Sequence, residues 1–185
     1  MIVQTRGALE PLLHLEPGHS AELAGAAAAL AELSGRAARR LAGALDGIWL
    51  GETALPGLAA LVHLCAADTV PRPRPPVDLA PAAGRRIVIG SGPHVSGSLA
   101  HHAAGHALCG LDRAHLSPEW ARIMRRCAPV FRLPHYAAAA EEWWAESYAL
   151  VATGAAHRLF TLLSYDDAVA RLVWNYHAGD RGAAE

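Results

Sequence analysis

The chain has 185 residues, and 16 Lys and Arg side chains nearly balance 17 Asp and Glu side chains, for a formal net charge of −1. This balance gives no attraction to nucleic acid or to an anionic membrane, so we expect neither as a partner. The length suits a single domain over residues 1–185, and no apolar run reaches the roughly 18 residues that a membrane span needs.

The N-terminal third predicts one long helical region. The first residues lack the basic region and the sustained apolar stretch of a signal peptide, so we expect a cytoplasmic protein, with leaderless export as the alternative. Leucines at helical spacing predict a helix over residues 20–45, with Ser20 as its N-cap. Its glycines disfavour an uninterrupted helix, so we expect at least one break.

Two short β-prone runs follow. Glycines bound the run over 47–51 and the run over 86–90, and both are predicted to be strands. Between them, residues 55–67 are predicted to be helical. The proline-rich stretch over 70–81, which includes 71–76, is predicted to be a loop to which we assign no function.

The C-terminal half predicts helices throughout. A helix is expected within 94–111, with Ser96 or Ser98 as its cap and Gly110 at its end. Further helices are expected over 117–128, with Ser117 as the N-cap, and over 137–153 and 166–177. The fold class is therefore α+β, mostly helical with a small mixed sheet.

Two histidines in the first of these helices have a spacing suited to metal binding. His102 and His106 are four residues apart, so they project within about 40° of one another on one helix face, where two imidazoles can share a metal ion. His101 lies about 100° from His102 and is expected on the flank of the helix. A histidine-rich helix without a metal is the alternative.

The residues around this pair carry a resemblance. The stretch LAHHAAGHAL over 99–108 resembles the active-site helix of the zincin metallopeptidases, which contains the motif HExxH. The resemblance implies a zincin-like domain, a zinc cofactor and hydrolysis of peptide bonds. One residue departs from the motif, because Ala103 stands where the family carries glutamate.

A second motif supplies a candidate third ligand. The run EEWWAE that starts at Glu141 resembles the glutamate helix of the gluzincin branch, most closely the anthrax-lethal-factor-like and pro-pro endopeptidase group. This resemblance implies that Glu142 binds zinc and that Glu146 orients a ligand histidine. Glu141 and Glu146 remain alternative ligands. The non-functional alternative is that all three glutamates lie on a solvated helix face. Trp143 and Trp144 are expected in the core.

Three further residues are candidates for the site. Tyr136 matches, by position, a tyrosine that stabilises the transition state in this group, although His135 could take this task and a tyrosine that covers the core is the alternative. Asp112 is the ligand that a metzincin pattern would use, six residues after His106. That pattern also requires glycine where this chain has Cys109. Cys109 could approach the metal, being three residues after His106, but is expected to be a buried structural thiol.

The same resemblance indicates the partner. The strand containing Ile87–Ile89 resembles the edge strand on which zincins bind an extended peptide, so a peptide or protein substrate is expected there. The sequence defines neither the cleavage specificity nor the oligomeric state.

The alanine at position 103 changes the expected activity. In the family the glutamate is the general base, and such catalysis is worth about 10²–10⁴-fold, so the chain should be nearly inactive yet still bind zinc. A deliberate Glu-to-Ala replacement in a peptidase is one explanation. A natural pseudopeptidase that only binds peptides is the second. A helical protein without metal is the third.

Overall fold

The computed structural model describes residues 7–15, 17–33, 35–51, 86–90 and 96–182 of the chain. It divides into two compact units, Met1–Val95 and Ser96–Glu185, each of which is treated by itself below. The helix expected over 55–67 and the proline-rich loop lie outside the described residues. That the whole chain forms a single domain stays a prediction.

The first unit contains a three-stranded sheet. A 3-10 turn over Glu10–Leu12 leads into β1 (Leu13–Leu15), and the strands β2 (Gly47–Gly51) and β3 (Arg86–Gly90) were both predicted. The order is β1-β2-β3, and both pairings are parallel. The expectation of a mixed sheet was therefore wrong for the described strands, although the mostly helical class with a small sheet is confirmed. β1 was not predicted, because three residues are too few to show a strand pattern.

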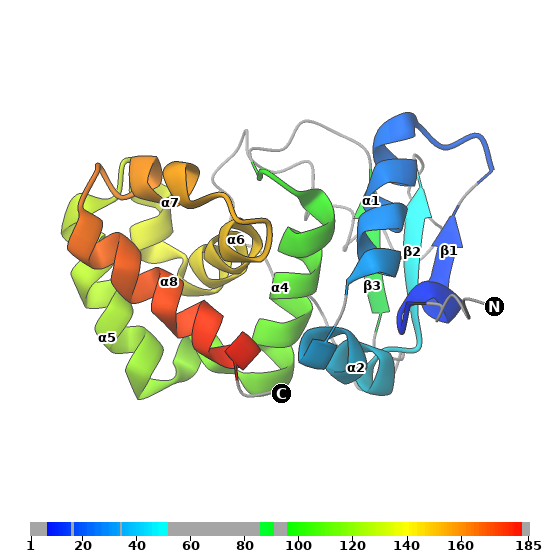
Figure 1. Cartoon of the computed structure of the whole chain (residues 1–185), viewed down its shortest axis with the longest axis horizontal. Coiled ribbons are helices and arrows are strands. Elements are labelled where there is room, and N and C mark those ends of the chain that lie inside the picture. Colours follow the sequence, from blue (N-terminus) through cyan, green and yellow to red (C-terminus); the bar gives the residue numbers. More distant parts are fainter. Residues whose placement is uncertain (1–6, 16, 34, 52–85, 91–95, 183–185) are drawn as a thin grey trace. The chain divides into compact units, whose positions relative to one another are not determined.

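The predicted N-terminal helix forms as two helices, α1 (Ala21–Glu32) and α2 (Gly35–Ala44). The backbone N–H of Leu23 donates to Ser20 Oγ at 3.4 Å, which confirms Ser20 as the N-cap. The expected break falls just before Gly35, whose φ of +72° is unfavourable for other residues. Figure 1 shows α1 lying beside the sheet with its axis along the strand direction, and α1 contacts both β1 and β2.

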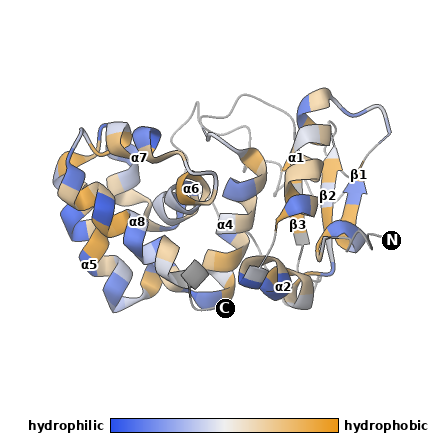
Figure 2. Cartoon of the chain, in the orientation of Figure 1, coloured by the Kyte–Doolittle hydropathy of each residue, from blue (hydrophilic) through white to orange (hydrophobic). Residues whose placement is uncertain are grey.

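The second unit is helical throughout its described part. Its longer elements are α4 (Leu99–Asp112), α5 (Pro118–Cys127), α6 (Ala140–Ala152), α7 (Ala156–Leu162) and α8 (Asp167–Gly182). Short 3-10 turns lie at Ala114–Leu116, Ala128–Val130 and Pro134–Ala138. Figure 2 shows both hydrophilic and hydrophobic residues on α5, consistent with a helix that has one face in the core.

Several predicted helix ends are displaced. α4 begins after its cap Ser98 and runs past Gly110, the predicted end, to Asp112, because Arg113 adopts the left-handed conformation (φ 51°) that ends the helix. α6 begins three residues later than predicted because a 3-10 turn precedes it. α7 was not predicted at all. Ser117 caps α5 as expected, since its Oγ accepts the Trp120 N–H at 3.1 Å.

The core of the second unit forms around α6. Trp143 and Trp144 are both buried, which confirms their expected place. Trp143 packs edge-on against Phe131, and Trp144 lies against His177 of α8 with ring centroids 4.9 Å apart. No helix among the described residues is long and apolar enough to cross a membrane.

The helices α4 and α6 pack closely against one another. A Cβ atom placed on Gly105 would lie 2.9 Å from both the Cα and the carbonyl oxygen of Ala145, a separation that real Cβ atoms essentially never show. Only glycine fits at this crossing. It brings the histidine face of α4 against the glutamates of α6.

Candidate metal centre

The two histidines of α4 project from one buried face of the helix. Both imidazoles are buried, and their Nε2 atoms are 3.1 Å apart. The rings meet edge to face, with an interplanar angle of 73°. The helical spacing predicted from the sequence thus places the two nitrogens beside one another.

Glu142 of α6 faces both of these nitrogens. Its Oε1 lies 3.3 Å from His102 Nε2, and its Oε2 lies 3.2 Å from His106 Nε2. Ligand atoms from the three residues lie within 4.8 Å of one another, and among the described residues this cluster could hold a metal ion. The structure therefore brings together the three residues that the two motifs singled out.

The separations of these atoms fit a tetrahedral ion. Zinc binds imidazole nitrogen and carboxylate oxygen at about 2.0–2.1 Å, so two tetrahedral ligand atoms should be about 3.3 Å apart. The three separations here are 3.1, 3.2 and 3.3 Å. Three protein ligands leave a fourth position for water or substrate, which is typical of catalytic zinc.

The other nitrogen of each imidazole faces a second carboxylate. His102 Nδ1 lies 3.0 Å from Oε2 of Glu146, whose side chain is only 1% exposed. His106 Nδ1 lies 3.5 Å from Oε1 of Glu141, whose side chain is 21% exposed. A histidine that donates its Nδ1–H to a carboxylate presents the Nε2 lone pair to a metal. Glu141 thus lies behind His106, on the side away from Glu142.

In the absence of a metal, the histidines and carboxylates of the cluster shift each other's pKa values toward their charged forms. Burial lowers the pKa of His102, but hydrogen bonds and charges from Glu142 and Glu146 outweigh burial and raise this pKa to about 9. Burial raises the pKa of Glu142, but its hydrogen bonds to His102 and His106 outweigh burial and hold this pKa well below its usual range. A metal ion must therefore displace a proton from His102.

The two predicted catalytic positions have different surroundings. Ala103 is buried on α4 between the two histidines in sequence, and its methyl group cannot accept a proton. Tyr136 is also buried, and its ring packs against Phe131, His135 and Trp143. Its expected role at the transition state stays a prediction.

The competing ligands lie outside the cluster that the described residues form. Asp112 is exposed at the end of α4. Cys109 is buried, as expected, with its Sγ 3.3 Å from His115 Nδ1. Burial raises the pKa of the Cys109 thiol to about 12, so it stays protonated and is a poor metal ligand. His101, on the helix flank, pairs with Ser98 Oγ through Nδ1 at 2.8 Å.

Sequence reasoning missed one charged neighbour of this cluster. Arg158 of α7 has its Nη2 3.8 Å from Glu146 Oε1. No motif pointed to Arg158, because it lies on a helix that the sequence did not predict.

Comparisons with known proteins bear on the fold. No family model and no curated protein matches the sequence. Among solved structures, the chain is similar to the pro-pro endopeptidase PPEP-2 from Paenibacillus alvei, with a TM-score of 0.61 and 19% identity over 94% of this chain and 99% of that one. At this identity the likeness shows the fold alone.

Proposed function

We propose that this chain is a zinc-dependent metallopeptidase that lacks its general base. His102, His106 and Glu142 bind the zinc, while Glu146 orients His102 and Glu141 orients His106. The convergence of three ligand atoms within 4.8 Å carries this proposal. The likeness in fold to a pro-pro endopeptidase supports it.

The chemistry would divide between the metal and the chain. Bound zinc would polarise a peptide carbonyl and acidify a water molecule. The two imidazoles and Glu142 fix the ion, and Tyr136 is the residue that we assign to donate a hydrogen bond to the developing oxyanion. At position 103, where a carboxylate would take the proton of the water, alanine offers no acceptor. We therefore expect hydrolysis to be slowed about 10²–10⁴-fold.

We assign a peptide or protein as the substrate. β3 stands at one end of the strand order, and among the described strands none pairs with its outer edge. An extended peptide could add to Ile87–Ile89 by β-augmentation.

Ala103 also favours a second candidate, a zinc-binding pseudopeptidase that holds peptides without cleaving them. The two candidates share the zinc site and the proposed peptide-binding strand β3. They differ only in whether restoring a carboxylate at position 103 restores hydrolysis.

The metal claim is tested by zinc stoichiometry. After exhaustive dialysis, elemental mass spectrometry should find about one zinc ion per chain in the unaltered protein and much less in Glu142→Ala. Glu119→Ala, at an exposed position in the first turn of α5, is the matched control and should keep the ion. Absence of zinc from all three proteins would contradict the proposal.

The activity claim is tested with Ala103→Glu. Incubated with a peptide library, this variant should yield products that a zinc chelator abolishes, at a rate about 10²–10⁴-fold above the unaltered chain. Ala103→Gln is the control, since it has the size of glutamate but cannot act as the base. A zinc-loaded Ala103→Glu variant that cleaves nothing would favour the pseudopeptidase.

A further inference from the structure

We infer that Arg158 is a positioning residue of the metal centre, which acts through Glu146 on His102. This inference rests on the proposed function, because it assigns a role toward the bound metal. In the described part of the chain, Arg158 forms no ion pair or hydrogen bond with His102, His106 or Glu142. Its effect on the metal site must therefore pass through the Glu146 carboxylate, which lies between Arg158 and His102.

The first observation is the condition of the Glu146 carboxylate. Its Oε2 accepts the hydrogen bond of His102 Nδ1 at 3.0 Å. Its Oε1 is buried and has no hydrogen-bond partner in the described structure. A buried anionic oxygen is costly unless a positive charge lies near it, and Nη2 of Arg158 lies 3.8 Å away.

The second observation is the charge balance of the centre. Three carboxylates, those of Glu141, Glu142 and Glu146, contact the two imidazoles. A divalent ion with two neutral histidines balances two of these three negative charges. Arg158 supplies the third positive charge, on the side of Glu146, which is the most buried carboxylate of the three.

The third observation is that the guanidinium of Arg158 lies next to the residues that precede α4. A Cβ atom placed on Gly97 would lie 3.2 Å from Nη1 of Arg158, so the guanidinium rests against this glycine. Gly97 directly precedes Ser98, the N-cap of the helix that carries both histidines. Arg158 therefore contacts both the carboxylate of Glu146 on α6 and the residue that precedes the N-cap of α4.

Because Arg158 is partly exposed, its effect on zinc affinity can be measured apart from any effect on folding. Its side chain is 42% exposed, whereas that of Glu146 is 1% exposed. Removing the guanidinium opens no large cavity in the core. We therefore expect an Arg158 variant to fold while its metal affinity falls.

The test is a double-mutant cycle on zinc affinity, measured by competition with a chromophoric chelator. Arg158→Gln should weaken zinc binding about tenfold, the lower end of the 10–100-fold range for groups that orient metal ligands. In a Glu146→Gln background the same change should have little effect, because its route to His102 is gone. Arg158→Lys, which keeps the charge, should recover part of the loss.

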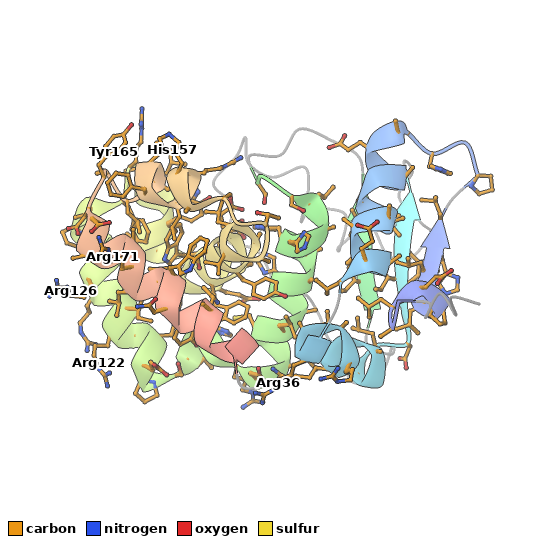
Figure 3. The ribbon with its side chains drawn as sticks, in the orientation of Figure 1. Arg36, Arg122, Arg126, His157, Tyr165 and Arg171 are labelled. Atoms are coloured by element: carbon orange, nitrogen blue, oxygen red, sulfur yellow. The ribbon has the colours of Figure 1, made fainter. Side chains whose placement is uncertain are left out.

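Arg171→Gln is the matched control. Arg171, labelled on α8 in Figure 3, is 75% exposed and pairs with Asp167 at 2.6 Å. This change should leave zinc affinity unaltered. Thermal melts in chelator should show that metal-free Arg158→Gln still unfolds cooperatively, as Arg171→Gln does, so that its loss of zinc affinity is measured on a folded protein.

Failure of the Arg158 role and failure of zinc binding give different results. An equal loss of affinity from Arg158→Gln in both backgrounds, or no loss at all, would overturn this inference while the zinc site stands. An unaltered chain that binds no zinc would contradict the metallopeptidase proposal and this inference together.

Discussion

The two histidines of the candidate metal centre both contact Glu142, but their other ring nitrogens face different carboxylates. His102 Nδ1 lies 3.0 Å from Oε2 of the buried Glu146, whose Oε1 in turn lies 3.8 Å from Nη2 of Arg158. Behind His106, Glu141 is 3.5 Å away and partly exposed to water. Glu141 is open to competition from water and Glu146 is not, so we expect Glu146 to orient its imidazole more strongly. We therefore expect the two sides of the proposed zinc site to contribute unequally to its affinity.

The largest effect should come from Gly105→Ala, which disturbs both sides at once. Its new Cβ would collide with the backbone of Ala145, and overpacking of this kind costs about 1–3 kcal/mol, partly offset by about 1 kcal/mol of helix propensity. The displaced helices should separate both histidines from Glu142. Zinc affinity should fall more than 100-fold, beyond the range for a group that only orients a ligand.

A matched glycine tests this explanation. Gly43 in α2 has open space around its would-be Cβ atom, so Gly43→Ala should preserve the melting temperature or raise it slightly. If Gly105→Ala also keeps its zinc affinity and melting temperature, the close crossing is not what assembles the centre.

The pH dependence should show the next largest effect. The pKa of His102 is raised to about 9, so below this pH a proton competes with the metal for that ring. Zinc affinity should therefore fall about tenfold per unit between pH 8 and pH 6, as isothermal titration calorimetry with proton-release analysis can measure. An affinity independent of pH in this range would contradict the protonated His102.

The metal-free protein should show the opposite trend. Because the folded pKa of His102 lies above the ordinary value of 6.5, its contribution to stability is complete below pH 6.5 and is lost as the pH rises through 9. Chemical denaturation in chelator should show this decline. In Glu146→Gln the decline should be smaller, because one of the carboxylates that raise the pKa has been neutralised.

On the His102 side, Glu146→Gln should weaken zinc binding about 10–100-fold. Glutamine keeps the size of the side chain but removes the charge that faces His102 Nδ1. Competition with a chromophoric chelator measures the loss. A loss no greater than that of an exposed control such as Glu119→Gln would mean that this carboxylate does not orient the ring.

On the His106 side, Glu141→Gln should weaken zinc binding less than tenfold. The separation from His106 Nδ1 is longer, and water can replace part of the interaction. The same competition assay compares it directly with Glu146→Gln. Equal losses from the two variants would remove the asymmetry described above.

The sequence predicts those parts of the fold that depend on neighbours along the chain. The caps Ser20 and Ser117 are visible because a hydroxyl in front of an apolar helical run satisfies free backbone N–H groups. The two longer strands are visible because glycines bound them. The histidine and glutamate candidates are visible because a spacing of four residues defines a helix face.

The remaining features depend on contacts between distant segments. The place of Glu141 behind His106 follows from how α4 crosses α6, which no local pattern encodes. The strand β1 exists because β2 lies beside it, and Arg158 matters because α7 packs near α6. The end of α4 at Asp112, two residues past Gly110, reflects the conformation of Arg113 rather than the residue usually chosen to stop a helix.

The contact between Gly105 and Ala145 has a consequence for finding such centres by sequence. Each of these two small residues sits inside a motif, directly before His106 and directly before Glu146. Histidine pairs at this spacing are common, but a pair becomes half of a centre only where the opposing backbone can come close. A search pattern that requires glycine before the second histidine and alanine before the last glutamate would therefore select chains whose two helices can meet. It would do so even where the residue after the first histidine is not glutamate.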